Sequence, residues 1–169
     1  MKRIFRMMAG YNRWANGRLY AAAATLPDAD YRADRGAFFG SVHRTLNHIL
    51  VGDRIWMSRF IGEGETYTQL DAVPFDDFDD LVAAREAEDE RMVGWIEGLT
   101  GKQFNGTFSY RTISNPADVT QPLAPALSHF FNHQTHHRGQ VHALLSGLGL
   151  DPPSLDLILF QRETGIGLT

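Results

Sequence analysis

Four long stretches of this chain place apolar residues at intervals of three and four, and this spacing restricts the fold more than any other feature. Such intervals put the apolar side chains on one face of an α-helix. Charged residues 85–91 in the third stretch are expected on a solvent-exposed face. The pattern predicts helices over about residues 2–25, 36–61, 77–99 and 122–148, and a short helix after "DPPS".

Residues 101–121 break this pattern. They are rich in Thr, Ser, Asn, Gly and aromatic residues and have no helical period, which predicts a long ordered connection with room for two short strands. Together the elements predict an all-α fold, namely a four-helix bundle with a long crossover connection and a short C-terminal helix. Because no linker or repeat interrupts the chain, we expect a single domain over residues 1–169.

Composition excludes several functional classes. The formal net charge is -4, which argues against nucleic acid as a partner. The chain contains no cysteine, so it has no disulfide, thiolate metal site or cysteine nucleophile. No apolar run is long enough to span a bilayer, and we therefore expect a soluble, cytoplasmic protein with no membrane partner.

Five of the seven histidines lie between Ser128 and Leu145, inside the fourth predicted helix. His133 and His137 occupy the middle of its inward face and, being four residues apart, lie one above the other. Their nitrogens can therefore converge on one ion at about 2.0–2.1 Å, the usual zinc–nitrogen distance. The inward positions are Ala126, Phe130, His133, His137, Gln140 or Val141, Leu144 and Leu148.

A simpler interpretation is that these are core histidines, each satisfied by a hydrogen bond. A stacked pair makes that less favourable, because two buried imidazoles need two separate partners. His129, His136 and His142 lie off the inward face and are expected at the surface or behind the ligands. His129 precedes His133 by one turn and is the alternative to it as a ligand.

A third ligand is expected from the second predicted helix, where His43 and His48 flank the apolar face on opposite sides. Small residues near His48, among them Gly52, leave room above the backbone and favour His48 over His43. The sequence supports two roles for Asp53 about equally. It orients a ligand histidine or binds the metal, or it pairs with Arg138 or another arginine.

Three histidines without a fourth protein ligand would leave a coordination position open, as catalytic metal sites do. The first histidine of the pair is not followed by the glutamate of zinc peptidases, and the chain has no Glu-x-x-His sequence of the di-iron bundles. A mononuclear, histidine-rich site suits Zn or Ni better than Mg or Ca.

Three segments, "YNRWANGRL", "SVHRTLNHILVGDRIW" and "HFFNHQTHHRGQVHALL", resemble the DinB family over nearly the whole chain. The resemblance implies a divalent metal, often Ni or Zn, held by His48, His133 and His137, and a homodimer. It also makes Arg138, Gly139 and Gln140 signature residues beside the site, without an assigned chemical role. The family name refers to damage-inducible expression, and the wider superfamily includes thiol-dependent S-transferases and a metal-dependent isomerase.

Two functional hypotheses follow. The first is a metal-dependent enzyme that acts on a small molecule, as a thiol-dependent transferase or a hydrolase. Any thiol must then come from a low-molecular-weight cosubstrate, because the chain has no cysteine. The second is a non-catalytic bundle that binds metal or ligand in a stress response. A polar pocket beside the ion favours the enzyme, and a dry, closed site favours the second hypothesis.

Overall fold

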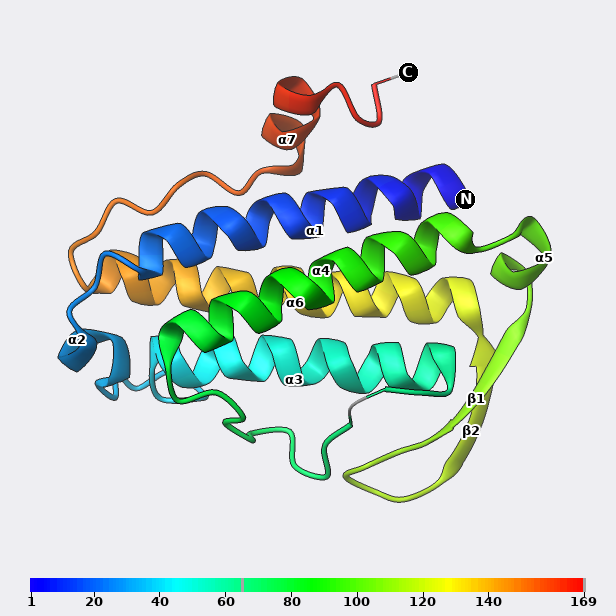
Figure 1. Cartoon of the computed structure of the whole chain (residues 1–169), viewed down its shortest axis with the longest axis horizontal. Helices are drawn as coiled ribbons and strands as arrows, with labels where there is room; N and C mark the ends of the chain where they lie inside the picture. The colour runs from blue at the N-terminus through cyan, green and yellow to red at the C-terminus, as the bar shows by residue number, and fades with distance from the viewer. Residues whose placement is uncertain (65, 169) are drawn as a thin grey trace.

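The computed structural model describes residues 1–64 and 66–168 and is mainly α-helical, with one small antiparallel sheet (Figure 1). The mainly helical prediction is confirmed, with this sheet in addition. The long helices are α1 (Lys2–Ala23), α3 (Val42–Ile61), α4 (Phe78–Gly98) and α6 (Leu123–Gly147). The shorter elements are α2 (Asp28–Arg32), α5 (Gly101–Phe104), β1 (Thr107–Arg111), β2 (Asp118–Pro122) and α7 (Leu157–Thr164).

Each long helix packs against two others. Both α1 and α3 contact α4 and α6. In Figure 1, α3 and α4 run in one direction, whereas α1 and α6 run in the other. The chain between α3 and α4 therefore returns along the length of the molecule. The long crossover is this connection and not residues 101–121, where the sequence placed it; those residues leave and return at one end of the helices, and the tip of their hairpin extends below α3 (Figure 1).

The second long helix begins six residues later than predicted, at Val42. Gly36 and Gly40 have positive φ angles of 71° and 82°, which a helix does not allow. Ser41 then caps the helix, because its side chain accepts a hydrogen bond from the Arg44 backbone N–H at 3.2 Å. The apolar pattern extends beyond the helix because Phe38 and Phe39 lie in the preceding turn.

The expected strands form a hairpin, in which Thr107 pairs with Pro122 and Arg111 with Asp118. Its aromatic residues hold it against the end of α3. The ring of Phe108 lies 5.0 Å from that of Phe60, and the ring of Tyr110 lies 5.5 Å from that of Trp56. These contacts place the loop between β1 and β2 beside α3.

The core between the long helices is not uniformly apolar. One apolar cluster includes Leu46, Leu81 and Leu145, and another includes Met57, Ile96 and Phe130. Between them along every long helix lie buried polar side chains, here called the polar layer. The polar layer consists of Asn12, Asn16, Asp53, Arg85, Asp89, Gln134 and Arg138.

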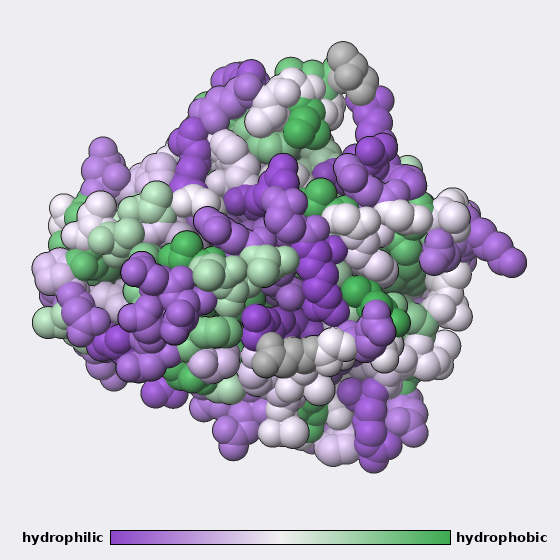
Figure 2. Space-filling view, in the orientation of Figure 1, coloured by the Kyte–Doolittle hydropathy of each residue, from purple (hydrophilic) through white to green (hydrophobic). Residues whose placement is uncertain are grey.

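The prediction of a solvated face over residues 85–91 is wrong for three of them. Arg85, Glu88 and Asp89 have exposed fractions of only 2%, 5% and 3%. Arg85 and Asp89 find partners on α3 and α1, whereas Glu88 pairs with Arg91 of its own helix, and buried charges need such partners. Hydrophilic residues nevertheless run through the middle of the face that α1 and α4 present (Figure 2). In the described part of the chain, none of the helices has the length and apolarity to cross a membrane.

Candidate metal centre

The three histidines predicted as ligands lie together between α3 and α6. His48 comes from the middle of α3, and His133 and His137 come from successive turns of α6. His48 and His137 are buried, and His133 is half-buried. Each offers a ring nitrogen to a group in which all three nitrogens lie within 4.8 Å of one another, so the cluster can hold a divalent metal ion.

The ring nitrogens that face each other are the Nε2 atoms. The Nε2 atom of His137 lies 3.2 Å from that of His48 and 3.1 Å from that of His133. Nitrogens bound at about 2.0–2.1 Å to one ion are about 2.9 Å apart at a right angle and about 3.3 Å apart at a tetrahedral angle. The observed spacing falls between these values.

Hydrogen bonds fix which nitrogen carries the proton in two of the rings. His48 Nδ1 lies 2.7 Å from the carbonyl oxygen of Leu70, and His137 Nδ1 lies 2.7 Å from Gln140 Oε1. Both oxygens can only accept, so each Nδ1 donates and each Nε2 presents a lone pair. Two lone pairs 3.2 Å apart repel unless a cation lies between them, which is the arrangement that metal-binding histidines have.

Burial also keeps the histidines neutral. It lowers the pKa of His48 to about 4, although the hydrogen bond to Leu70 opposes the shift. The pKa of His133 falls to about 3 through burial and through the neighbouring histidines. Burial lowers the pKa of His137 as well. At neutral pH the three rings are therefore in the form that binds a metal.

The donor set is purely histidine. Within residues 1–64 and 66–168, no carboxylate and no fourth histidine joins the three Nε2 atoms. Imidazole ligands suit Zn, Ni, Cu and Fe, whereas Mg and Ca prefer oxygen. Three ligands on one side of an ion leave its other side open.

Two neighbours shape the space around the cluster. The ring of Phe39 stacks on His48 with centroids 3.8 Å apart and meets the edge of His137. Gly52 faces His133, and a Cβ atom added there would lie only 3.1 Å from His133 Cε1. The sequence indicated that Gly52 leaves room beside the site, and the ring that uses this room is His133.

A cavity of about 420 Å³ opens beside His48 and His133. One wall comes from α3 and the other from the hairpin, whose loop contributes Thr112, Ser114 and Asn115. The cavity therefore joins the open side of the histidine cluster to polar groups. Its remaining lining residues are Gly52, Ile55, Trp56, Arg59, Leu70, Tyr110, Ile113 and His129.

Asp53 is not a neighbour of the ligand histidines. Its carboxylate accepts hydrogen bonds from Arg85 Nη1 at 2.6 Å and from Gln134 Nε2 at 2.8 Å, inside the polar layer. The structure therefore has the arginine pairing that the sequence offered as one alternative, with Arg85 as the partner. Arg138 also lies in the polar layer, where it donates to Asn12 and Asn16 of α1.

The other predicted residues divide between the site and its surroundings. Gln140 orients His137, as described. His129 is exposed in the cavity wall, with its ring 5.1 Å from Trp56 and 5.9 Å from His133. His43, His136 and His142 lie outside the cluster. The sequence analysis missed Arg59, Tyr110 and Leu70, whose proximity depends on the hairpin and the loop after α3.

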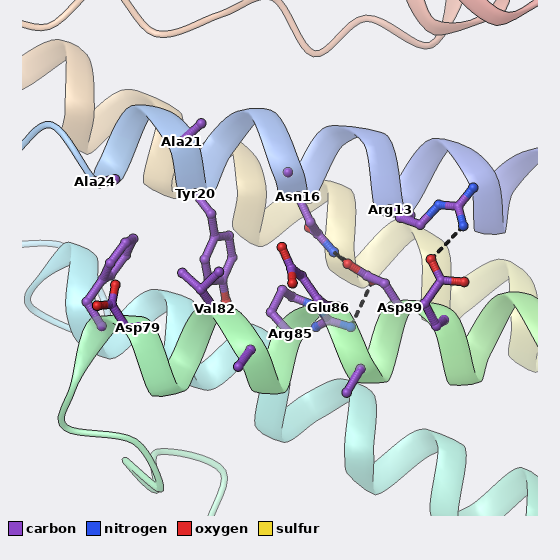
Figure 3. Close-up of a pocket in the computed structure, with 15 residues that line it drawn as sticks. Arg13, Asn16, Tyr20, Ala21, Ala24, Asp79, Val82, Arg85, Glu86 and Asp89 are labelled. Carbon is purple, nitrogen blue, oxygen red and sulfur yellow. Dashed lines mark hydrogen bonds and ion pairs between the residues drawn. The ribbon is translucent and has the colours of Figure 1, made fainter.

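A separate groove of about 790 Å³ lies between α1 and α4 (Figure 3). Several of its charged side chains pair with one another. Arg13 binds Glu90 at 2.6 Å, Arg85 lies 2.9 Å from Asp89, and Asn16 donates to Asp89 at 3.0 Å. Because these groups are engaged with one another and none of the clustered histidines lines the groove, the metal centre and its cavity form the better candidate site.

The sequence model of the DinB family matches residues 1–167. The chain belongs to the DinB family. It is also similar to Protein DinB of Bacillus subtilis (strain 168), with 27% identity over 167 residues that cover 91% of this chain and 92% of that protein. The family resemblance of the three sequence segments is thus confirmed, and in this DinB-family chain the histidines of two of them form the cluster.

Proposed function

We propose that this DinB-family protein is a metal-dependent enzyme that transfers a low-molecular-weight thiol to a small electrophile. The observation that carries the proposal is the cluster of three Nε2 atoms beside a partly polar cavity. A non-catalytic metal site needs no such cavity, whereas an enzyme needs space for its substrates next to the metal.

The chain supplies no thiol, since it has no cysteine, so the nucleophile must enter the cavity as a cosubstrate. When bound, a divalent ion would supply the Lewis acidity that lowers the pKa of a thiol or a water molecule. In the reaction the sulfur–carbon bond forms, the bond from that carbon to its leaving group breaks, and the thiol proton passes to solvent. Attack by water instead of the thiol would make the protein a hydrolase.

Residues of the chain would hold the reactants in place. His48 and His137 keep their Nε2 atoms directed at the ion through Leu70 and Gln140. The hairpin loop lines the cavity with hydroxyl and amide groups that can bind a polar substrate. Nickel and zinc both suit the three histidines, and we propose one of them as the native metal.

Elemental analysis of the untagged protein tests the metal site. We expect about one equivalent of Zn or Ni, lost in His133→Ala and His137→Ala while circular dichroism shows an intact fold. His142→Ala, which changes a histidine of α6 outside the cluster, should retain the metal. A wild-type protein that holds no metal and resists reloading would overturn the proposal.

A panel of thiols and electrophiles then tests catalysis with the metal-loaded protein. Turnover that disappears in His137→Ala and survives in His142→Ala would support the transferase. Stoichiometric metal without turnover would instead favour the second candidate, a non-catalytic protein that binds metal or ligand in a stress response.

We further infer that the four long helices form a four-helix bundle, because each packs against two others in a closed set. The cytoplasm as location, a homodimer as the assembly and expression induced by damage are proposals that rest on the sequence and on family membership.

A further inference from the structure

Arg59 lies at the end of the cavity remote from His48. Its guanidinium carbon is 4.7 Å from the ring centre of Trp56 and 4.5 Å from that of Tyr110. Both rings line the same cavity. The side chain is thus held between a helix residue and a hairpin residue, facing space that a ligand can enter.

In the described part of the chain, no carboxylate forms an ion pair with Arg59. Two other arginines with restricted exposure do have such partners, whereas the buried Arg138 is held by side-chain amides of α1. Arg85 pairs with Asp53, and Arg91 pairs with Glu88 at 2.8 Å. Burial lowers the pKa of Arg59, which reflects a loss of hydration without a neighbouring carboxylate. An anion in the cavity would supply the charge interaction that Arg59 lacks.

The position of Arg59 along α3 determines how far its side chain lies from the three histidines. Arg59 follows His48 by three helical turns, which separates their backbones by about 16 Å along α3. Side chains on a helix lean toward its N-terminus, so the guanidinium points back along the cavity toward the histidines. Gly52, which faces His133, precedes Arg59 by seven residues, so about 10 Å along α3 separates Arg59 from the level of the His133 ring.

The cavity wall between these two ends is mainly apolar. Ile55 and Trp56 lie along α3, and the edge of His129 meets the Trp56 ring. A volume of about 420 Å³ accommodates a small molecule of this length. The cavity thus offers a cation at one end, an aromatic wall in the middle and the histidine cluster at the other end.

We propose that Arg59 binds a carboxylate of the small molecule that occupies this cavity and so selects an acidic cosubstrate. This inference rests on the proposed function, under which the cosubstrate is a thiol. Its carboxylate would then lie about 10 Å from its sulfur. The planar guanidinium donates two parallel hydrogen bonds to the carboxylate, and the rings of Trp56 and Tyr110 contact the chain that connects the two groups.

Matched thiols on the cobalt-loaded protein test this proposal, because the visible absorption of cobalt changes when sulfur joins the ion. We expect ω-mercaptooctanoate to bind about tenfold or more tightly than ω-mercaptooctanol, as a charge-assisted hydrogen bond implies. The shorter ω-mercaptopropionate should gain nothing from its carboxylate relative to mercaptopropanol, since it cannot reach Arg59.

Arg59→Gln should abolish the preference for the acid, whereas Arg59→Lys, which keeps the charge, should retain part of it. Arg44→Gln makes the same change on the same helix outside this cavity and should leave the preference intact. Equal binding of the acid and the alcohol by the wild type, or a preference that survives in Arg59→Gln, would overturn the role of Arg59.

Octanoate without a thiol separates this inference from the proposed function. Calorimetry should detect its binding to the wild type and a loss of about tenfold or more in Arg59→Gln. If octanoate binding depends on Arg59 but no thiol alters the cobalt spectrum, Arg59 binds carboxylates and the proposed thiol transferase is wrong. If octanoate binds equally well to Arg59→Gln while thiols bind the metal, the role of Arg59 is wrong and the transferase proposal is unaffected.

Discussion

Gly52 has no side chain at the point where the ring of His133 comes nearest to α3. In Gly52→Ala the new Cβ atom would lie 3.1 Å from His133 Cε1, so the ring must move. We expect metal affinity to fall by about tenfold or more, as it does when groups supporting a ligand are changed. Competition with a chromophoric chelator measures this loss.

Gly139→Ala is the matched control for this substitution. Gly139 also lies in a helix beside the site, but no atom lies within 4 Å of a Cβ added there. Both variants gain up to about 1 kcal/mol in helix propensity. Unchanged metal affinity in Gly52→Ala would show that the His133 ring has more freedom than its position indicates.

The depressed pKa values of the histidines predict how the metal-free protein responds to acid. Burial holds the pKa values of His48 and His133 at about 4 and 3, below the value of about 6.5 in the unfolded chain. Between pH 6.5 and 4 the unfolded chain therefore binds more protons. We expect the free energy of unfolding to fall as the pH decreases through this range, by about 1 kcal/mol per pH unit and histidine.

Urea titrations at several pH values measure this effect. The buried carboxyl of Asp53 acts in the opposite direction, because burial raises its pKa to about 6, so the wild type must be compared with a variant. His48→Ala should have a smaller loss of stability between pH 6.5 and 5 than the wild type, and His142→Ala should match the wild type. Identical slopes in all three proteins would contradict the assignment.

At the scale of helices, α4 joins the others through charge as well as through apolar contacts. Arg85 bridges Asp53 of α3 and Asp89 of its own helix, and Asp89 accepts hydrogen bonds from α1. Arg85→Met would leave two buried carboxylates without their cation. We expect the free energy of unfolding to fall by about 3–5 kcal/mol, measured by urea denaturation.

Arg13→Met is the control, since Arg13 also joins α1 to α4 through its pair with Glu90. That pair is exposed, with side-chain exposures of 49% and 64%, and its loss should cost less than about 1 kcal/mol. Equal effects of the two substitutions would show that the buried ion pairs do not stabilise the packing of α4.

The sequence was sufficient to predict the long helices and the juxtaposition of His133 and His137 because both depend on local spacing. His133 and His137 meet through the period of a single helix. The polar layer was not predictable in this way. Arg85 and Asp89 have the spacing of an exposed ion pair, and only their partners on other helices reveal that they are buried.

The cavity depends on contacts between distant segments, which explains why its residues were missed. Arg59 has the spacing of an ordinary surface residue on α3. Its environment comes from Tyr110, about fifty residues later in the hairpin. The predicted strands gave no indication of the side on which the hairpin packs. The contact of Tyr110 with Trp56 and the position of Arg59 in the cavity were therefore not predictable.

For the molecule as a whole, a metal bound by the three histidines would join α3 to α6 and raise the free energy of unfolding. A ligand at a thousandfold excess over its Kd adds about 4 kcal/mol to the free energy of unfolding. For a chain of this size we expect chelation to lower Tm by roughly ten degrees in calorimetry. A chelator should have no such effect on His137→Ala, and an unchanged wild-type Tm would contradict a role of the metal in stability.

Family resemblance also predicts that two chains associate. Light scattering should give a mass of twice the 19.0 kDa of one chain. The mass should stay the same across the micromolar range, because a stable homodimer does not dissociate there. A mass of one chain would contradict the homodimer.

The polar layer limits how far the long helices can slide along one another. A shift of α6 by one turn, about 5.4 Å, would carry Arg138 into an apolar cluster and take Gln134 away from Asp53. The leucines and phenylalanines of the two apolar clusters would tolerate such a shift with a modest loss of stability. The charged groups of the polar layer would lose their partners and destabilise the fold more. The alignment that brings His133 and His137 level with His48 is therefore set by residues that never touch the metal, before any ion arrives.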